Sequence, residues 1–286
     1  MNKLLFVLKL IAAPVVLVLL QAQVSTGKEP AALPRAHAHN DYYHDRPLLD
    51  ALDHGFCSVE ADVFPCDGKF LVGHDLWELR PKRTLEALYL KPLKERFDAS
   101  LKDSEKGSIL AGCEPLILLV DLKRRTSTTY DQLHQVLSNY QGMLAGVQDG
   151  RLVPGAVMVI LSGNRPIEQI KDDKDRLVFL DGRPEQLDDP NQFSTSVMPL
   201  VSIGAGSFRR AKEDETRPPG SLERYLEMNR LEDLVDRCHT EGYKFRLWGF
   251  PDTPACWSTL YDMDVDLINT DNLSGLQQFL RDARQQ

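Results

Sequence analysis

The amino-acid sequence predicts an α/β protein with a (β/α)8 barrel, the TIM-barrel fold. Two observations support this class. Eight short β-type runs alternate with segments of helical pattern, and polar residues gather where the first three runs end. In such a barrel the carboxyl ends of the strands carry the active site. A length of 286 residues accommodates one barrel.

The order of elements follows from runs rich in β-branched and aliphatic residues and from helical periodicity between them. The predicted strands are residues 33–39, 56–63, 115–123, 155–163, 177–182, 199–204, 244–250 and 265–271. Clear helical patterns cover residues 46–55, 129–142, 221–242 and 273–286. Residues 91–112 are expected to form an insertion at the barrel rim, and residues 209–221 a long polar loop after the sixth strand.

The first residues are typical of a secretory signal peptide. Lys3 and Lys9 precede an apolar run over residues 10–20, and Ala22 is a suitable last residue before cleavage. A membrane anchor is the alternative, but the uninterrupted run is shorter than the roughly 20 residues that span a bilayer. We therefore predict a signal peptide at residues 1–26, a single barrel domain at 27–286, and export to the periplasm or the extracellular space.

Charge and cysteine content narrow the possible partners. A formal charge of −8 argues against a broad nucleic-acid surface but leaves room for a local phosphate pocket. The five cysteines are an odd number, so at least one is free or pairs between chains. Cys66, in the turn beside an acidic pair, is the preferred candidate for a disulfide, whereas Cys57 and Cys238 are expected to be buried thiols.

Three acids on neighbouring strands predict a metal site. Residues i and i+2 of a strand point to the same side, so Glu60 and Asp62 both face the barrel axis and Val59 and Ala61 face the helices. Asp121 lies at the end of the next strand. Three carboxylates in one cavity need a compensating charge, and oxygen ligands favour Mg²⁺ or Ca²⁺.

Histidines and a lysine surround the predicted metal site. His37 and His39 share one face of the first strand, and Lys123 shares a face with the acid of the third strand. The turn at residues 66–68 reverses the chain, so that His74 returns to the same mouth. Two histidines beside a metal-bound phosphate are suited to proton transfer in both directions.

These motifs resemble a known superfamily. The segments "HAHNDY", "SVEADV", "GHD" and "LLVDLK" are similar to those of the phosphatidylinositol phospholipase C-like phosphodiesterases, which include glycerophosphodiester phosphodiesterases and venom-type sphingomyelinases D. The "HxHNDY" branch, with the fungal altered-inheritance-of-mitochondria proteins, is the nearest in pattern. The likeness runs from His37 to Lys123 and resumes weakly at "FRLWGF" and "DVDLINTD".

The resemblance implies a role for each matching residue. Glu60, Asp62 and Asp121 match the metal-binding acids of the superfamily. His74 matches its second catalytic histidine, and Lys123 matches the lysine near the phosphate. The implied fold is a TIM barrel of the phospholipase C-like phosphodiesterase type.

The first catalytic histidine stays open between two residues. Spacing to the acids favours His39, whereas the sphingomyelinase pattern selects His37 together with Asn40. Trp248 matches an aromatic residue at the substrate mouth, with core packing as the alternative. The arginine that follows the first histidine in glycerophosphodiesterases is missing, and its candidate replacements are Arg46, Asn164 and Arg183.

The expected activity is metal-dependent hydrolysis of a phosphoric diester by two-histidine acid–base catalysis. The substrate would be a glycerophosphodiester or a phospholipid head group, with peripheral membrane contact and no nucleic acid as partner. Two alternatives remain: an amidohydrolase-type barrel, suggested by the "HxH" pair and Asp271, and an inactive barrel that only binds phosphorylated ligands. The sequence leaves open the head group, release of a cyclic phosphate, and oligomeric state.

Overall fold

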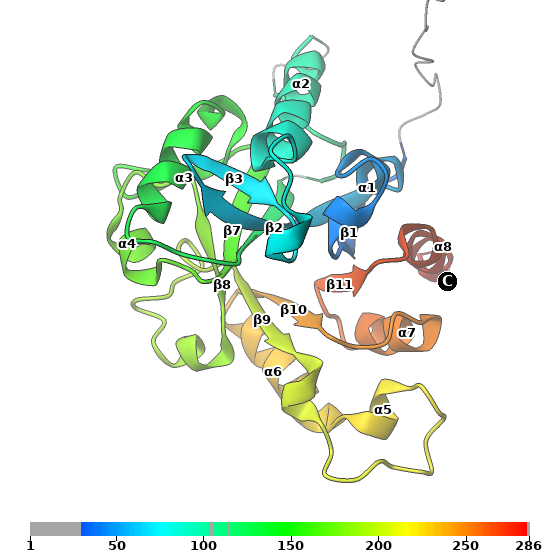
Figure 1. Cartoon of the computed structure of the whole chain (residues 1–286). Helices are drawn as coiled ribbons and strands as arrows, with labels where there is room; N and C mark the ends of the chain where they lie inside the picture. The colour runs from blue at the N-terminus through cyan, green and yellow to red at the C-terminus, as the bar shows by residue number, and fades with distance from the viewer. Residues whose placement is uncertain (1–29, 103, 105, 114, 285–286) are drawn as a thin grey trace, which may run out of the picture.

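The computed structural model describes residues 30–102, 104, 106–113 and 115–284. The predicted signal peptide, residues 1–26, lies outside them. Figure 1 shows a central barrel with helices packed around it. None of the helices in the described ranges is long and apolar enough to cross a membrane.

Eight parallel strands form a closed barrel. Closure is explicit because β1 pairs with β2 on one side and with β11 on the other. The barrel strands are β1 (Leu33–Ala38), β2 (Phe56–Cys66), β4 (Leu116–Leu122), β7 (Val157–Gly163), β8 (Phe179–Gly182), β9 (Leu200–Gly204), β10 (Lys244–Trp248) and β11 (Leu267–Thr270). Each falls within or beside a predicted strand, and the predicted TIM barrel is confirmed.

A ninth strand extends the second one beyond the barrel. The antiparallel strand β3 (Lys69–Val72) pairs with the end of β2. Asp67 and Gly68 form the turn with φ of 48° and 74°, the positive values that a tight two-residue hairpin requires. This hairpin is the predicted excursion, and it returns the chain to the barrel mouth at His74.

Helices cover the outside of the barrel (Figure 1). They are α1 (Leu49–Asp53), α2 (Lys91–Ser100), α3 (Thr129–Ser138), α4 (Ile167–Asp172), α5 (Leu222–Tyr225), α6 (Met228–Thr240), α7 (Pro254–Asp262) and α8 (Leu273–Ala283). The prediction of one helix over 221–242 is wrong, because the chain is extended at Leu226 and divides that stretch into α5 and α6. A 3-10 helix, Pro184–Asp188, replaces an α-helix between β8 and β9.

Two apolar clusters lie on opposite sides of the barrel wall. One lies between the strands and the helices, and the other lies inside the barrel. Val59 and Ala61 are fully buried against the helices, as predicted. Inside, Leu119 and Phe179 pack with Val147 of the short hairpin formed by β5 (Gly146–Gln148) and β6 (Arg151–Val153). This hairpin fills the amino end of the barrel. The inward-facing acids of β2 and β4 lie toward the carboxyl end of the barrel.

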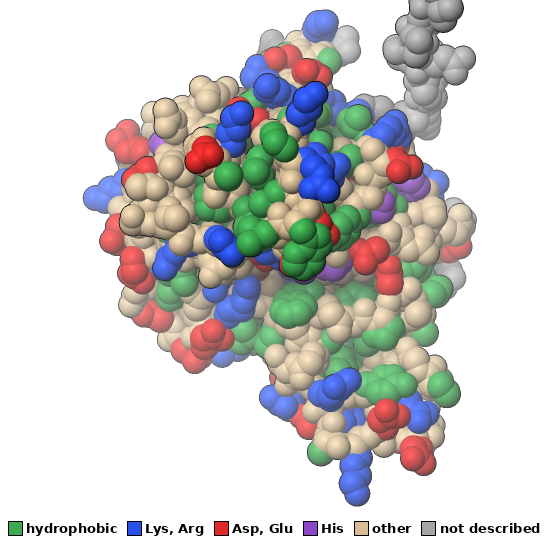
Figure 2. Space-filling model, in the orientation of Figure 1, with side chains coloured by type: hydrophobic (Ala, Val, Ile, Leu, Met, Phe, Trp, Pro, Cys, Tyr) green, Lys and Arg blue, Asp and Glu red, His purple; other side chains and the backbone are tan. Residues whose placement is uncertain are grey.

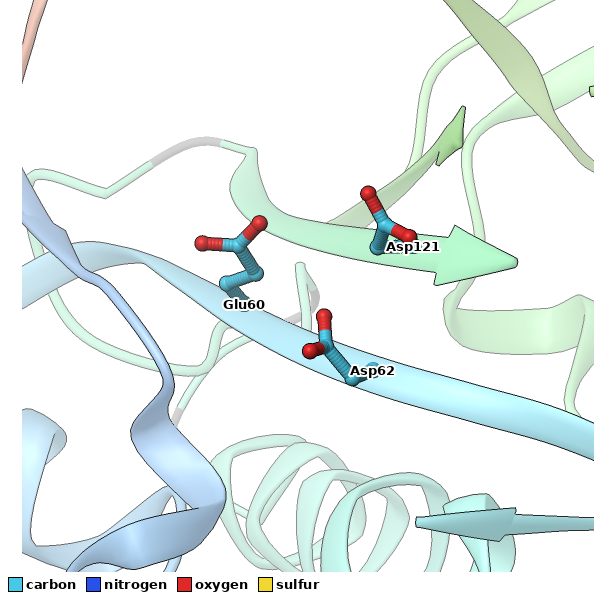
Figure 3. Close-up of side chains that lie close together, drawn as sticks. All are labelled: Glu60, Asp62 and Asp121. Atoms are coloured by element: carbon cyan, nitrogen blue, oxygen red, sulfur yellow. The ribbon is translucent and has the colours of Figure 1, made fainter. Parts of the chain in front are cut away.

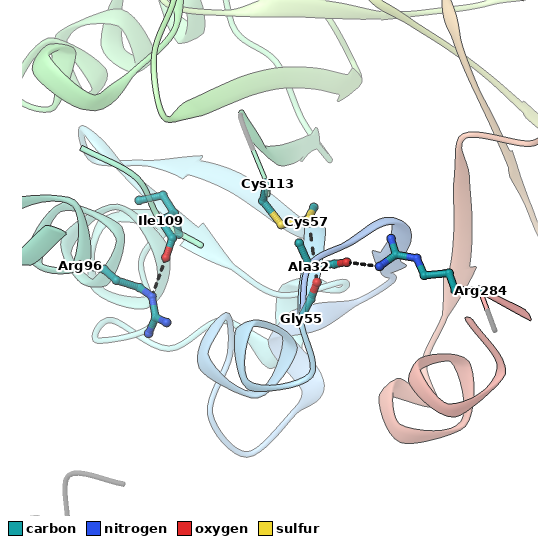
Figure 4. The surroundings of a disulfide bond; sticks show 7 residues. All are labelled: Ala32, Gly55, Cys57, Arg96, Ile109, Cys113 and Arg284. Atoms are coloured by element: carbon teal, nitrogen blue, oxygen red, sulfur yellow. Dashed lines mark hydrogen bonds between the residues drawn. A yellow bond between two sulfur atoms is a disulfide. The ribbon is translucent and has the colours of Figure 1, made fainter. Parts of the chain in front are cut away.

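The disulfide differs from the one expected. Cys57 and Cys113 are bonded, whereas Cys66 is an exposed free thiol and Cys238 is buried and free. Helix α2 and the segment after it bring residue 113 back to the start of β2, where the two Cα atoms lie 5.1 Å apart. Figure 4 shows this region, where Arg284 near the chain end also donates to the carbonyl of Ala32 at 2.7 Å.

Candidate metal centre and active site

The three predicted metal-ligating acids meet inside the barrel mouth. Asp62 of β2 lies directly opposite Asp121 of β4, and Glu60 lies one inward-facing position deeper on β2. One carboxylate oxygen from each acid lies within 4.8 Å of the others. Figure 3 shows the three side chains pointing from two neighbouring strands toward a common centre. The strand register therefore brings the acids together as the alternation of the strands predicts.

A buried arginine neutralises the deepest acid. Arg246 of β10 donates to Glu60 Oε2 at 2.9 Å, and its Nε donates to Asn269 Oδ1 at 3.1 Å. Burial opposes ionisation of Glu60, but the Arg246 charge and the neighbouring histidines outweigh it and hold the pKa of Glu60 well below its usual range. Glu60 is thus a carboxylate at every ordinary pH.

Three donors converge on one oxygen of Asp62. Its Oδ2 accepts from the Tyr42 hydroxyl at 2.7 Å and from Lys123 Nζ at 2.8 Å, and it lies 2.9 Å from His74 Nδ1. The Tyr42 hydroxyl is also 2.8 Å from Asn40 Oδ1. Asp62 is 1% exposed, so these contacts replace the water that it loses.

Lys123 links the two aspartates. Its Nζ lies 3.4 Å from Asp121 Oδ1 in addition to its contact with Asp62. Burial raises the pKa of Asp121, and the charges of Asp62 and Glu60 raise it further against the opposing effect of Lys123. Burial also acts against the charged Lys123, but the two aspartates outweigh it and raise the pKa of the lysine. The centre therefore has an excess of negative charge that a divalent cation would relieve.

The donor set fits a hard divalent cation. All its candidate ligands are carboxylate oxygens, which Mg²⁺ and Ca²⁺ prefer. Each acid keeps one oxygen, Glu60 Oε1, Asp62 Oδ1 and Asp121 Oδ2, without a hydrogen-bond or ion-pair partner among the described residues. One oxygen of each acid is thus fixed by the protein and the other is available to an ion.

The two histidines of the first strand occupy different environments. His37 is fully buried, with Nδ1 2.7 Å from Ser58 Oγ and Nε2 3.5 Å from Glu60 Oε2. Burial and the nearby Arg246 charge lower the pKa of His37 to about 4. His37 is consequently neutral at physiological pH and out of reach of solvent.

His39 lies at the rim. Its side chain is 34% exposed, with Nδ1 2.9 Å from Asp271 Oδ1 and Nε2 3.9 Å from Glu60 Oε2. Burial disfavours the imidazolium, but the Asp271 hydrogen bond and the Glu60 charge outweigh it and raise the pKa of His39. Asn40, in left-handed conformation with φ of 48°, places its Nδ2 3.0 Å from His39 Nδ1.

The remaining predicted residues divide between the mouth and the outer surface. His74 is 51% exposed and Trp248 is 44% exposed, so Trp248 is not a core residue. Arg46, which precedes α1, pairs with Asp50 and Asp53 of that helix rather than with the acids of the mouth. Arg183 pairs with buried Asp181 at 2.9 Å, and Asn164 donates to the backbone carbonyls of Leu122 and Lys123 at the end of β4.

Sequence reasoning missed three residues that contact this centre: Tyr42, Arg246 and Asp271. Tyr42 stands in the quoted "HAHNDY" motif. Arg246 stands two positions before Trp248, so strand alternation places Arg246 and Trp248 on the same face of β10. The sequence suggested Asp271 only through the amidohydrolase-type alternative. Its contact with His39 depends on the pairing of the first and last strands.

The barrel and the oxygen-ligand cluster at its carboxyl end define the class of protein, a (β/α)8 barrel with a candidate divalent-cation centre. Comparison with known families gives the particular group. Residues 30–181 match the model of the AIM6-like phosphodiesterase domain, and the chain belongs to this family.

Curated relatives agree with this assignment, and a solved structure shares the fold. The chain is 29% identical over 278 residues to Altered inheritance of mitochondria protein 6 of Eremothecium gossypii, covering 88% of this chain and 71% of that protein. It is 30% identical over 271 residues to the Saccharomyces cerevisiae (strain YJM789) protein, covering 83% and 68%. The fold resembles a Parabacteroides distasonis glycerophosphodiester phosphodiesterase, with a TM-score of 0.51, 15% identity, and coverage of 91% and 100%.

Proposed function

We propose that this protein is a metal-dependent phosphoric diester hydrolase that uses two histidines as proton carriers. The observation that carries the proposal is the meeting of three carboxylate oxygens within 4.8 Å, with solvent-accessible His39 and His74 beside them. Glu60, Asp62 and Asp121 would hold Mg²⁺ or Ca²⁺. When bound, such an ion polarises phosphoryl oxygens and neutralises charge that develops on them.

His39 and His74 are the proposed acid–base pair. Asp271 fixes His39 through Nδ1, which leaves Nε2 to take a proton from the attacking hydroxyl or water. Asp62 contacts His74 through Nδ1, which leaves the other ring nitrogen of His74 to protonate the departing alkoxide. Buried His37 holds Glu60 in place and transfers no proton to or from the substrate in this scheme.

Lys123 supplies the positive charge that faces a bound phosphate. Its ammonium group is partly exposed and is held between Asp62 and Asp121. A fixed cation at this position stabilises the oxygens of the phosphoryl group as charge builds up on them. Arg246 is buried deeper in the barrel, where it pairs with Glu60 and does not face the substrate.

A glycerophosphodiester or a phospholipid-type molecule fits the surface around the mouth. Leu76 and Trp77, the latter 74% exposed, lie two and three residues after His74, and the exposed Tyr43 donates to Glu78 of the same segment. Figure 2 shows hydrophobic side chains over β3 and the segment after it, with lysine and arginine side chains around them. Tryptophan and tyrosine favour the interface between lipid and water, so peripheral membrane contact is part of the proposal.

An exported location is proposed on two grounds. The Cys57–Cys113 disulfide is stable in an oxidising compartment and rare in the cytosol. The amino-terminal segment has the sequence features of a cleaved signal peptide. An amidohydrolase-type centre is not favoured, because the metal-ligand group among the described residues contains carboxylates and no histidine.

Hydrolysis of an aryl phosphodiester, measured with and without added Mg²⁺ or Ca²⁺, tests this function. Glu60→Gln removes one ligand and should abolish turnover, whereas the matched control Glu95→Gln, on the exposed face of α2, should keep it. Full activity in Glu60→Gln protein, or in wild-type protein stripped of metal, would refute the mechanism. Tight binding of the diester without turnover by any metal-loaded sample would favour the ligand-binding alternative.

A further inference from the structure

A cavity opens at the carboxyl end of the barrel, beside the proposed metal centre. It has a volume of about 730 Å³ and lies between the segment after β4 and the segment after β7. We call it the arginine groove, because Arg125 and Arg165 line it together with Thr126, Ser127 and Gln169. Its one acidic lining residue, Glu168, is paired with Lys171 at 2.9 Å.

The arginines of the groove have unsatisfied charge. Arg125 is exposed, and within the described ranges its side chain donates only to the backbone carbonyl of Arg165, at 2.9 Å. Arg165 donates to the backbone carbonyl of Asp181 and, at 3.4 Å, to Gln186 Oε1, and its buried Nε has no hydrogen-bond partner among the described residues. Neither guanidinium has a carboxylate within ion-pair distance in the part of the chain that the structure describes. Uncompensated cations at a cavity wall favour an anionic ligand.

A third arginine increases the positive charge. Arg183 lies near Arg165, and its charge adds to the effect of burial in lowering the pKa of Arg165. The carboxylate of Asp181 is paired with Arg183 at 2.9 Å, and the charges of Asp181, Glu185 and Asp121 offset only part of the effect of burial and Arg183 on Arg165. An anion in the groove would relieve this repulsion, although the whole protein carries a formal charge of −8.

The groove and the metal centre share a wall. Arg125 follows Asp121 by four residues, and Asn164 N donates to the Leu122 carbonyl at 2.9 Å. Gly163 lies against Asp121, because a Cβ atom at residue 163 would come within 2.5 Å of Asp121 Oδ1. A molecule bound at the acids can therefore extend directly into the groove.

We propose that the arginine groove binds a second anionic group of the substrate, a phosphate or carboxylate on the alcohol portion, while the reacting phosphodiester lies at the metal centre. This inference rests on the proposed function and specifies its substrate class. Guanidinium groups bind phosphate and carboxylate through paired charge-assisted hydrogen bonds, and the hydroxyls of Thr126 and Ser127 provide further donors. Diesters with a charged alcohol would thus be preferred over neutral ones.

Two substrates that differ by one phosphate test the proposal: glycerophosphoinositol and glycerophosphoinositol 4-phosphate. The wild-type KM should be about tenfold lower for the phosphorylated compound, with similar kcat. Arg125→Gln should reduce the ratio of the two KM values by about three- to tenfold, and Arg125→Lys should retain part of the preference. The matched control Arg151→Gln, on the hairpin at the opposite end of the barrel, should leave the ratio unchanged.

The outcomes separate this inference from the proposed function. If neither compound is hydrolysed, the proposed function fails, and calorimetric affinities of the chelator-treated protein for both compounds still test the groove. Equal KM values and equal affinities, or a ratio that survives Arg125→Gln, would overturn the inference. Binding of inorganic phosphate that depends on Arg125, with no preference between the two diesters, would assign the groove to a free anion and also overturn it.

Discussion

The stability of the Asp41→Asn variant relative to wild type should be higher at neutral pH than at acid pH. Asp41 is completely buried, and its Oδ2 accepts from Leu48 N at 2.5 Å. Burial raises the pKa of Asp41 to about 7. The Leu48 hydrogen bond and the Tyr89 hydroxyl act in the opposite direction, and Asp50 adds to the increase.

The magnitude follows from the linkage between protonation and folding. The shift from an ordinary pKa of 3.8 to about 7 is roughly three units, or about 4 kcal/mol of folding free energy at most. Because the folded pKa is raised, this stability is fully present below pH 3.8 and is lost as the pH rises to about 7. Asparagine keeps an acceptor for Leu48 N and does not ionise, so the variant avoids the loss.

Urea unfolding of wild type and Asp41→Asn between pH 4 and pH 8, without metal, measures the effect. The difference between the two proteins is the informative quantity, because His37, whose pKa is lowered to about 4, changes wild-type stability in the opposite direction over part of this range. We expect the variant to gain up to about 4 kcal/mol relative to wild type as the pH rises. A difference that is constant with pH, or that changes with the opposite sign, would refute the buried-acid reasoning.

Two further predictions concern the metal centre. Arg246→Met leaves Glu60 buried without its cation and should lower the metal-free stability by about 3–5 kcal/mol. Added Mg²⁺ or Ca²⁺ should then raise its Tm by more than it raises the wild-type Tm, and an equal rise would contradict the shared charge balance. His39→Ala should lower kcat for a phosphodiester by roughly 10²- to 10⁴-fold. His37→Asn should mainly reduce stability, and equal losses of kcat would remove the distinction between the two histidines.

The fold was predictable because each barrel strand has a strong local signal. "PLILLVDLK" and "GAVMVILSG" are nearly continuous apolar runs, as expected for strands that are buried on both faces. The break at Leu226 was not predictable in this way, since the helical pattern of residues 221–242 continues across it. The Cys57–Cys113 bond was also missed, because the path of α2 decides which residues meet across 56 positions.

The acids of the site were predictable from one strand rule, but their partners were not. Glu60 and Asp62 follow from alternation on β2, whereas Arg246 is 186 residues away in sequence and reaches Glu60 only through barrel closure. Asp271 meets His39 for the same reason, since β11 is the neighbour of β1. Local patterns indicate which side of a strand a residue faces, and closure of the barrel decides what it contacts.

Depth along the barrel explains why chemically similar residues at this mouth have different roles. Four strands each place an inner and an outer residue two positions apart: His37 and His39, Glu60 and Asp62, Arg246 and Trp248, Asn269 and Asp271. All four inner residues are buried, and every outer residue except Asp62 retains exposure. Asp62 is buried because the hairpin that returns at His74 and the loop that carries Tyr42 extend the mouth over it. Those two segments therefore make a rim carboxylate part of an enclosed candidate cation centre, and we expect a change that displaces either segment to weaken metal binding before it affects the barrel.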